Sequence, residues 1–278
     1  MITPHVMETL RDQLLEAARK RVLLMGILNV TPDSFSDGGQ HEGLEAALAH
    51  AGQMQAEGAD IIDVGGESTR PGAEPVSAEE ELARVIEVIE ALAGVGKLPV
   101  SIDTYKASVA REACRSGAVI INDVSGLADP EMAHVAAETG AALVVTYNSG
   151  ETDAMTETAS DMAAFFEEAF RKCDEAGVPG DRLILDPGVG FAKTYEQNFT
   201  VLGHVSNITQ FGCPVLVGVS RKSFIGRLLG GETDERLIGT LAAGLNAMKR
   251  GANILRVHDV AAHKQSITMW EAIDYAAD

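Results

Sequence analysis

The sequence predicts an α/β protein of the (β/α)8 TIM barrel class, and three observations support this prediction. Eight apolar stretches alternate with stretches whose apolar residues recur at helical spacing, so we expect parallel strands joined by helices. The length of 278 residues suits one barrel. The residues after the first strand read NVTPD and lack the G-x-G-x-x-G signature of an open, doubly wound nucleotide-binding sheet.

The expected strands are short apolar runs that end in polar residues, and a helical pattern follows each of them. The strands cover 22–30, 59–65, 99–103, 119–124, 142–147, 183–186, 214–219 and 254–257. The helical patterns cover 44–57, 78–92, 106–116, 130–139, 155–176, 196–206, a segment from 223 to 250, and 261–277. Two helix starts are marked in the sequence, by a capping-box pattern from Ser77 to Glu80 and by Asp129-Pro130.

Residues 5–20 predict one amphipathic helix ahead of the first strand, with Val6, Leu10, Leu14 and Ala17 on one face. We expect this helix to pack across the base of the barrel, and a role in dimer or partner contacts is the alternative. No linker composition interrupts the chain. The predicted organisation is therefore a helical extension over residues 1–20 and one barrel domain over residues 21–278.

Composition and charge limit the function classes. The net charge of −19 argues against nucleic acid as a partner, and no apolar run reaches the length of a membrane helix. The N-terminus lacks the basic and apolar segments of a leader, and Cys114, Cys173 and Cys213 have no metal-type spacing. We expect a cytoplasmic protein with reduced thiols.

The candidate site lies where the strands end, because the C-terminal ends of all eight strands meet at one mouth of a barrel. An Asp at one strand end is often only the cap of the next helix. A polar group at the end of every strand is better explained by a site. In chain order these groups are Asn29, Asp63 with 67–70, Asp103, Asn122-Asp123, Tyr147-Asn148, Asp186, Lys222, and Arg256 with His258-Asp259.

These side chains fall into two chemical sets. Asn29, Asp33, Arg70, Arg256 and His258 suit an anion with a metal such as Mg²⁺, since Arg matches phosphate oxygens and Mg²⁺ prefers oxygen ligands. Asp103, Asn122, Asp186 and Lys222 suit a flat, nitrogen-rich heterocycle, because a carboxylate accepts parallel N–H bonds and Lys donates. A purely structural Asp–Lys ion-pair network is the alternative for this second set.

Three further features lie in the segments that follow the strands. Residues 31–43 and 66–75 are the longest irregular stretches, and both would lie at the barrel mouth as mobile binding loops. The SRKS sequence at 220–223 leads from a strand into a helix start that favours an anion. Phe35 and Phe191 are aromatic residues in otherwise polar loops, where each could hold a flat ring.

At this point the motifs closely resemble those of the dihydropteroate synthase family of pterin-binding enzymes. The resemblance extends from Met25 to Asp259. The segments that carry it are 25–39 (MGILNVTPDSFSDGG), 63–72 (DVGGESTRPG), 101–104 (SIDT), 121–126 (INDVSG), 185–193 (LDPGVGFAK), 220–223 (SRKS) and 256–259 (RVHD).

The resemblance implies a (β/α)8 barrel, usually a homodimer, that is a target of sulfonamides. It implies transfer of an alkyl group: 6-hydroxymethyl-7,8-dihydropterin diphosphate and 4-aminobenzoate give 7,8-dihydropteroate and diphosphate, in folate synthesis. The implied pterin site is Asp103, Asn122, Asp186, Lys222 and Arg256, of which Asp103, Lys222 and Arg256 are the implied catalytic residues. The implied Mg²⁺ contact is Asn29, with Arg70, Arg256 and His258 near the diphosphate, and the implied aminobenzoate site is Phe35, Thr69, Pro71, Phe191 and Ser223.

The resemblance departs in one place that matters for the site. After the fifth strand, family members often carry His followed by Met or Trp, whereas this chain has Thr146-Tyr147-Asn148. We assign no catalytic role to Tyr147 or Asn148, although a contact at the pocket edge stays open. The alternatives are a methyltetrahydrofolate–corrinoid methyltransferase, which has no need of the TPDSFSD loop or the SRKS segment, and a non-catalytic pterin-binding barrel, which would lack a residue such as Phe35, Arg70 or Lys222.

Overall fold

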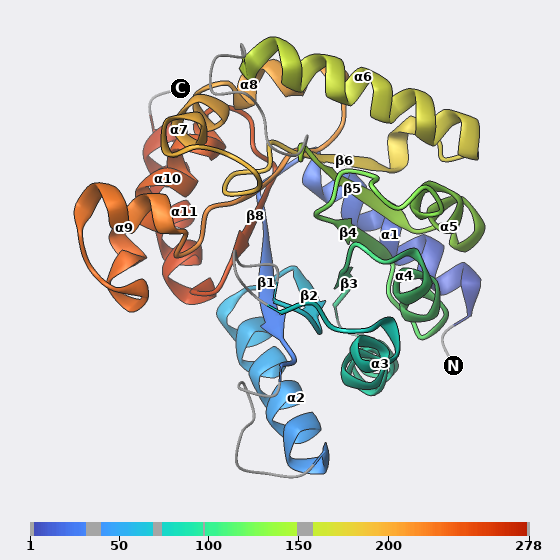
Figure 1. Cartoon of the computed structure of the whole chain (residues 1–278). Helices are drawn as coiled ribbons and strands as arrows, with labels where there is room; N and C mark the ends of the chain where they lie inside the picture. Colours follow the sequence, from blue (N-terminus) through green and yellow to red (C-terminus); the bar gives the residue numbers. More distant parts are fainter. Residues whose placement is uncertain (1–2, 32–39, 69–73, 97, 149–157, 277–278) are drawn as a thin grey trace.

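A computed structural model of the chain describes residues 3–31, 40–68, 74–96, 98–148 and 158–276. It contains a parallel eight-stranded barrel surrounded by helices, as the sequence predicts (Figure 1). The strands are β1 (Leu23–Asn29), β2 (Ile61–Gly65), β3 (Val100–Asp103), β4 (Ile120–Asp123), β5 (Ala142–Thr146), β6 (Leu183–Asp186), β7 (Leu216–Gly218) and β8 (Ile254–Val257). Their order is β6-β5-β4-β3-β2-β1-β8-β7, and a bridge between Leu185 and Val215 joins the two end strands.

Helices follow the strands at the expected places. They are α1 (Pro4–Ala18), α2 (Gln40–Glu57), α3 (Ala78–Val95), α4 (Ala107–Arg115), α5 (Met132–Thr139), α6 (Thr158–Ala176), α7 (Tyr195–Gly203), α8 (Val205–Ile208), α9 (Ser223–Leu229), α10 (Leu237–Lys249) and α11 (Val260–Tyr275). Short 3-10 helices are η2 (Gly180–Arg182), η3 (Thr209–Phe211) and η4 (Thr233–Arg236). None of the helices described is long and apolar enough to cross a membrane.

Two expected helix starts and one expected capping box need correction. Helix α2 begins at Gln40, so residues 40–43 belong to a helix and the first loop ends earlier than predicted. Helix α5 begins at Met132, because the Asp129 carboxylate instead accepts hydrogen bonds from the Ala107 and Glu131 N–H groups. Ser77 does cap α3, but Glu80 forms an ion pair with Arg84 one turn further along the same helix.

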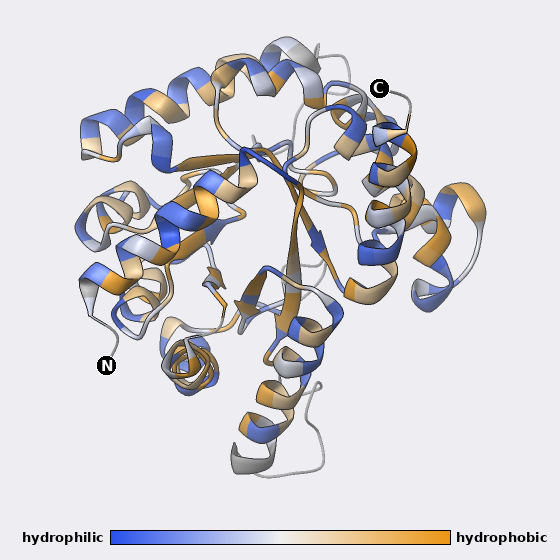
Figure 2. Cartoon of the chain, turned by 180° about the vertical axis from the view of Figure 1, so that it is seen from behind, coloured by the Kyte–Doolittle hydropathy of each residue, from blue (hydrophilic) through white to orange (hydrophobic). Residues whose placement is uncertain are grey.

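Helix α1 packs across the base of the barrel, as predicted from its apolar face (Figure 2). Its buried residues Leu14, Leu15 and Ala18 join a cluster with the inward-facing residues near the strand starts. The Asn253 amide also donates a hydrogen bond of 3.0 Å to the Ala18 carbonyl. This packing closes the end of the barrel opposite the strand C-termini, so the helix lies away from the candidate site.

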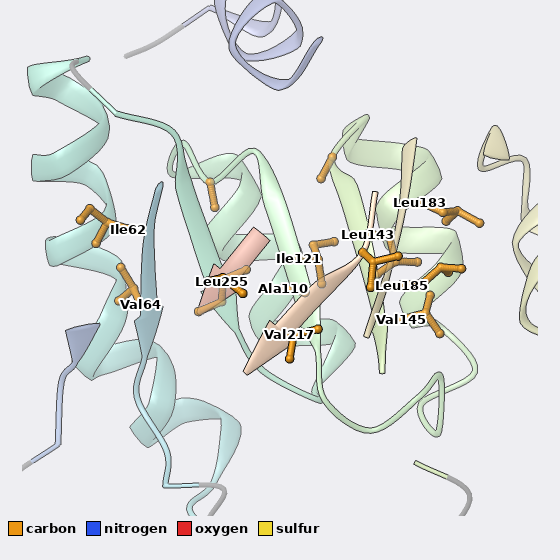
Figure 3. Packing of buried hydrophobic residues seen from close by; sticks show 14 of the residues in the cluster. Ile62, Val64, Ala110, Ile121, Leu143, Val145, Leu183, Leu185, Val217 and Leu255 are labelled. Carbon is orange, nitrogen blue, oxygen red and sulfur yellow. The ribbon is translucent and has the colours of Figure 1, made fainter. Parts of the chain in front are cut away.

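Two apolar clusters stabilise the fold, one on each side of the strands. The outward-facing residues of the strands, such as Ile62, Val64, Leu143 and Leu185, pack against the helices (Figure 3). The inward-facing residues fill the barrel in layers contributed by alternate strands. The strand registers place Ile61, Ile120, Ile184 and Ile254 in one fully buried layer.

The inward-facing positions become polar toward the mouth. Two residues beyond the four isoleucines, the same strands carry Asp63, Asn122, Asp186 and Arg256 in the next layer of the even-numbered strands. The layer above comes from the odd-numbered strands and contains Ile27, Asp103, Thr146 and Gly218. The apolar layers therefore support a polar mouth from below, which fixes the height of the candidate site in the barrel.

Candidate active site

Arg256 connects the polar groups at the centre of the barrel mouth. Its Nε donates to Asp63 Oδ2 at 2.6 Å, and its Nη2 donates to Asp103 Oδ2 at 2.5 Å. The Asn122 amide donates to the same Asp63 oxygen at 3.0 Å. The side chains of β2, β3, β4 and β8 thus form one hydrogen-bonded group, which brings together three of the predicted pterin-site residues and Asp63.

Several oxygens of this group lack a protein partner. Among the described residues, no hydrogen bond reaches Asp63 Oδ1, Asp103 Oδ1 or Asn122 Oδ1, although each atom is buried. Buried polar atoms nearly always have partners in native proteins, so unpaired acceptors gathered in one place indicate a site for a ligand. The mouth does contain an ion-pair network, but Arg256 forms it with Asp63 and Asp103, whereas the structural alternative expected Lys222 in this role. That network leaves these atoms unsatisfied.

The carboxylates of the mouth have altered acidity. Burial raises the pKa of Asp103 to about 7, with the positive charge of Arg256 acting in the opposite direction. Burial also raises the pKa of Asp186, against which the Gly188 N–H acts by donating to its Oδ1 at 2.7 Å. Both groups are therefore poised to lose or gain a proton closer to neutral pH than ordinary carboxylates.

Lys222 lies directly before helix α9 and extends back over the mouth. Its ammonium donates to the Val189 carbonyl and lies 4.3 Å from the centre of the Phe191 ring. Burial lowers its pKa to about 8, while Asp186 opposes the shift. A cavity of about 740 Å³ lies near the base of the barrel, between α1 and the end of α5. At the mouth, a flat ligand that binds Asp103 Oδ2 would need Arg256 to release this oxygen.

Two lysines, Lys193 and Lys222, hold the loop that follows β6. Lys193 donates to the Tyr147 carbonyl at 2.7 Å and to the Phe191 carbonyl at 3.1 Å, while Lys222 holds Val189. Gly188 has a φ of +69°, and a Cβ there would lie 2.0 Å from the Tyr147 carbonyl oxygen. The loop therefore needs glycine at this position to bring Phe191 beneath the Lys222 ammonium.

The predicted anion-binding residues are only partly described. Asn29 ends β1 and is half-buried, and His258 follows β8 with its Nδ1 2.9 Å from the Ser220 hydroxyl. Ser223 is the first residue of α9 and is exposed. The predicted loop residues Phe35, Thr69, Arg70 and Pro71, with Asp33, lie outside the described residues.

The base of the second loop is anchored by a buried charge network. Lys106 pairs with Glu67 and with Glu81, which lies 2.6 Å from its ammonium, and Tyr105 donates to Glu67 at 2.8 Å. Glu67 immediately precedes the segment that carries Thr69 and Arg70. The network fixes the point at which this segment leaves β2.

The oxygen atoms at the mouth could contribute to a metal site. The described residues contain no group of three His, Cys, Asp or Glu side chains able to hold a metal ion. A Cβ placed on Gly65 would lie 3.8 Å from Asn29 Oδ1 and 3.6 Å from Asp103 Oδ2, so two oxygens flank this point at the mouth. One amide oxygen fits Mg²⁺ that is held mainly by water and the phosphates of a substrate.

Two inward-facing groups lie beside the predicted site residues without being predicted themselves. Asp63, which the sequence identifies only as a strand-end residue, holds both Arg256 and Asn122. On β5 the inward position is Thr146, because Tyr147 packs outward against Phe165 with ring centres 5.2 Å apart. The alternation of buried strand residues was the available signal, but it requires the end of β5 to be known to one residue.

Known protein families and solved structures are similar to this chain in a way that agrees with this geometry. Residues 25–258 match the family described as pterin binding enzyme. The chain therefore belongs to the pterin-binding enzymes, and within them to the dihydropteroate synthase group. It is 49% identical over 257 residues to the dihydropteroate synthase of Bacillus subtilis, covering 92% of this chain and 89% of the relative. It is 46% identical over 255 residues to that of Escherichia coli, covering 90% of both chains.

Solved structures show the same likeness. A Clostridium difficile dihydropteroate synthase determined in the presence of pteroic acid has a TM-score of 0.88 at 45% identity, covering 91% of this chain and 97% of that one. The Xanthomonas albilineans enzyme with 4-aminobenzoic acid has a TM-score of 0.87 at 45% identity, covering 91% and 93%. The barrel fold and the family resemblance predicted from the sequence are thereby confirmed.

Proposed function

We propose that this protein is a transferase that joins 6-hydroxymethyl-7,8-dihydropterin diphosphate to 4-aminobenzoate, giving 7,8-dihydropteroate and diphosphate. The observation that carries the proposal is the group of unpaired buried oxygens around Arg256, on Asp63, Asp103 and Asn122. These acceptors suit the amino and ring N–H groups of a pterin. Relatives that share 45–49% of the sequence are named dihydropteroate synthases, which supports the same reaction.

The proposed reaction breaks the bond between the pterin methylene carbon and the diphosphate oxygen. The electron-rich pterin ring stabilises the cationic methylene that remains, so an SN1-like path is favoured. The amine of aminobenzoate then forms the new C–N bond and loses a proton. No side-chain nucleophile is needed, which agrees with the raised pKa values, about 12, of the buried Cys114 and Cys173 thiols.

The residues at the mouth have separate proposed roles. Asp103, Asn122 and Asp186 bind the polar edge of the pterin, and the negative charge of Asp103 stabilises the cation. Lys222 donates to the pterin, and Arg256, displaced from Asp103, stacks on its face. Arg70, Arg256 and His258 bind the diphosphate. Phe35, Thr69, Pro71, Phe191 and Ser223 form the aminobenzoate site. The segment from residue 31 to the start of α2 and the loop of 66–75 exclude water that would hydrolyse the cation.

We also propose Mg²⁺ as the metal, held by Asn29 and the substrate diphosphate. When bound, Mg²⁺ offsets the negative charge of the leaving diphosphate. The oxygens of Asn29 and Asp103 beside Gly65 support this placement. We further propose a homodimer that works in the cytoplasm, where Cys114, Cys173 and Cys213, all free and buried, would stay reduced.

The function is tested by measuring diphosphate release from purified protein with the pterin diphosphate and Mg²⁺. We expect release that depends on aminobenzoate and matches the 7,8-dihydropteroate formed. Asp103→Asn and Lys222→Ala should each remove most activity and leave the circular dichroism spectrum unchanged. Pterin binding without any product would favour the non-catalytic barrel, and methyl transfer from methyltetrahydrofolate to a corrinoid would favour the other alternative.

A further inference from the structure

Thr146 carries a buried hydroxyl that has no role in the proposed reaction. Thr146 ends β5 and is 0% exposed, and its Oγ1 has no hydrogen-bond partner within the part of the chain that the structure describes. An unsatisfied buried hydroxyl is costly, because it has lost its bonds to water without replacement. The position of Thr146 in the barrel indicates which ligand could form a hydrogen bond with this hydroxyl.

Strand registers place Thr146 among the polar groups of the mouth. It pairs with Asp186 on β6, and the neighbouring Tyr147 N–H donates to the Asp186 carbonyl at 2.8 Å. On the other side of β5 lies β4, which carries Asn122 with its unpaired Oδ1. Ala142 and Val144 face the barrel interior, so Thr146, with the same alternation, faces the interior too.

The low exposure of Thr146 does not separate it from the site. Asp63 is 0% exposed and Asn122 is 1% exposed, and both hydrogen-bond within the group around Arg256. A ligand that displaces Arg256 from Asp103 would reach the layer of the barrel that contains Asp103. The strand registers place Thr146 in this same layer.

A preference for β structure does not explain why position 146 carries threonine. The preceding positions are Val144 and Val145, which provide the same branched shape and strand preference without a hydroxyl. The other buried threonines among the described residues are paired: Thr240 Oγ1, for example, accepts from the Arg221 N–H at 3.1 Å. A group that destabilises the free protein is typical of a functional site.

We propose that Thr146 is a specificity-determining residue, whose hydroxyl forms a hydrogen bond with a ring nitrogen or oxygen of the bound pterin. The hydroxyl can donate to an acceptor or accept from an N–H, so it adds a third polar contact between those of Asn122 and Asp186. The inference rests on the proposed function in that the ligand is a pterin.

The test compares Thr146→Val, which removes only the hydroxyl at nearly constant shape, with Thr146→Ser, which keeps it. We expect Thr146→Val to weaken binding of the pterin diphosphate, measured by calorimetry, by roughly 3- to 10-fold. The KM for aminobenzoate at saturating pterin should stay within twofold of the wild-type value. Thr146→Ser should bind the pterin within about twofold of wild type.

Thermal unfolding of the free proteins provides the second measurement. Thr146→Val should unfold at the same temperature as wild type or higher, because the hydroxyl has no partner to lose. Thr240→Val is the matched control, which should unfold at a lower temperature because it leaves the Arg221 N–H unpaired. A lowered unfolding temperature for Thr146→Val with unchanged pterin binding would overturn the proposal, since it would assign the hydroxyl a structural partner.

The two proposals fail in distinguishable ways. A wild-type protein that binds the pterin but forms no dihydropteroate would contradict the proposed reaction, and the comparison of Thr146→Val with Thr146→Ser would still stand. An active wild-type enzyme whose Thr146→Val variant binds the pterin as tightly as wild type would contradict only the role of Thr146.

Discussion

Arg256 Nη2 lies 2.5 Å from Asp103 Oδ2, so the arginine occupies a carboxylate that the proposed pterin would use. The same guanidinium holds Asp63 through Nε at 2.6 Å. A bound pterin would have to take over the contact with Asp103, while the pair with Asp63 could continue to hold the arginine. Asp63 is therefore a positioning residue for Arg256.

Asp63→Asn should lower the free energy of unfolding by about 3 kcal/mol, because it removes a charge partner from a buried guanidinium. It should also reduce kcat/KM for the pterin diphosphate, since Arg256 and Asn122 both lose their anchor. Urea denaturation and initial rates measure the two effects. Glu168→Gln breaks an exposed pair with Arg171 and should change neither value measurably. Equal stability of the two variants would show that the Asp63 pair is dispensable.

The pH dependence of kcat/KM should be bell-shaped, with its maximum between about 7 and 8. Asp103, with its pKa raised to about 7, loses its negative charge as the pH falls through that value. Lys222, with its pKa lowered to about 8, loses its positive charge as the pH rises through that value. Because kcat/KM reports the free enzyme, both limbs should appear in its profile. A profile that stays flat from pH 6 to pH 9 would contradict these assignments.

Phe191→Leu should reduce kcat/KM for aminobenzoate by roughly 3- to 30-fold, since it removes the ring on which the Lys222 ammonium rests. Steady-state kinetics at saturating pterin diphosphate measures this. Phe199→Leu is the control, because that ring is 39% exposed and packs on Tyr195 and Phe224. Similar losses in both variants would mean that the effect comes from general packing.

Gly188→Ala should displace the loop that carries Phe191. The new Cβ would lie 2.0 Å from the Tyr147 carbonyl oxygen, at a φ of +69° that disfavours alanine. We expect at least a tenfold loss in kcat/KM and a lower unfolding temperature. Gly203→Ala, with no atom within 4 Å of the new Cβ, should leave activity intact. Full activity of the Gly188 variant would show that the loop tolerates a different path.

Asn29→Ala should raise the Mg²⁺ concentration needed for half-maximal activity, by about tenfold, because one oxygen ligand is lost. Asn29→Asp, which restores an oxygen, should recover much of the wild-type response. Titration of Mg²⁺ at fixed substrates measures both. An unchanged Mg²⁺ requirement in the alanine variant would remove Asn29 from the proposed metal contact.

The sequence was sufficient to predict the barrel and all eight strands, because parallel strands buried on both faces give strong apolar runs. The positions of Asp103, Asn122, Asp186 and Lys222 follow from the same pattern, since each residue ends or follows such a run. The geometry places all four at the mouth.

Other features depend on distant partners and so could not be predicted locally. Asp129 bonds to the start of α4 as well as to its own turn, which shifts the start of α5. The sequence alone does not show whether Thr146 or Tyr147 faces inward, because a shift of one residue at the end of β5 reverses the two side chains. The role of Asp63 arises only when β2, β4 and β8 are assembled around it.

The most direct test of the central claim follows conversion of the pterin diphosphate and aminobenzoate by mass spectrometry, with wild-type protein and Asp186→Asn. We predict that wild type forms one 7,8-dihydropteroate for each diphosphate released, and that Asp186→Asn loses most of this activity because its pterin contact is altered. Absence of dihydropteroate with the wild-type protein, or full activity in Asp186→Asn, would contradict the assignment of the barrel mouth as the pterin site.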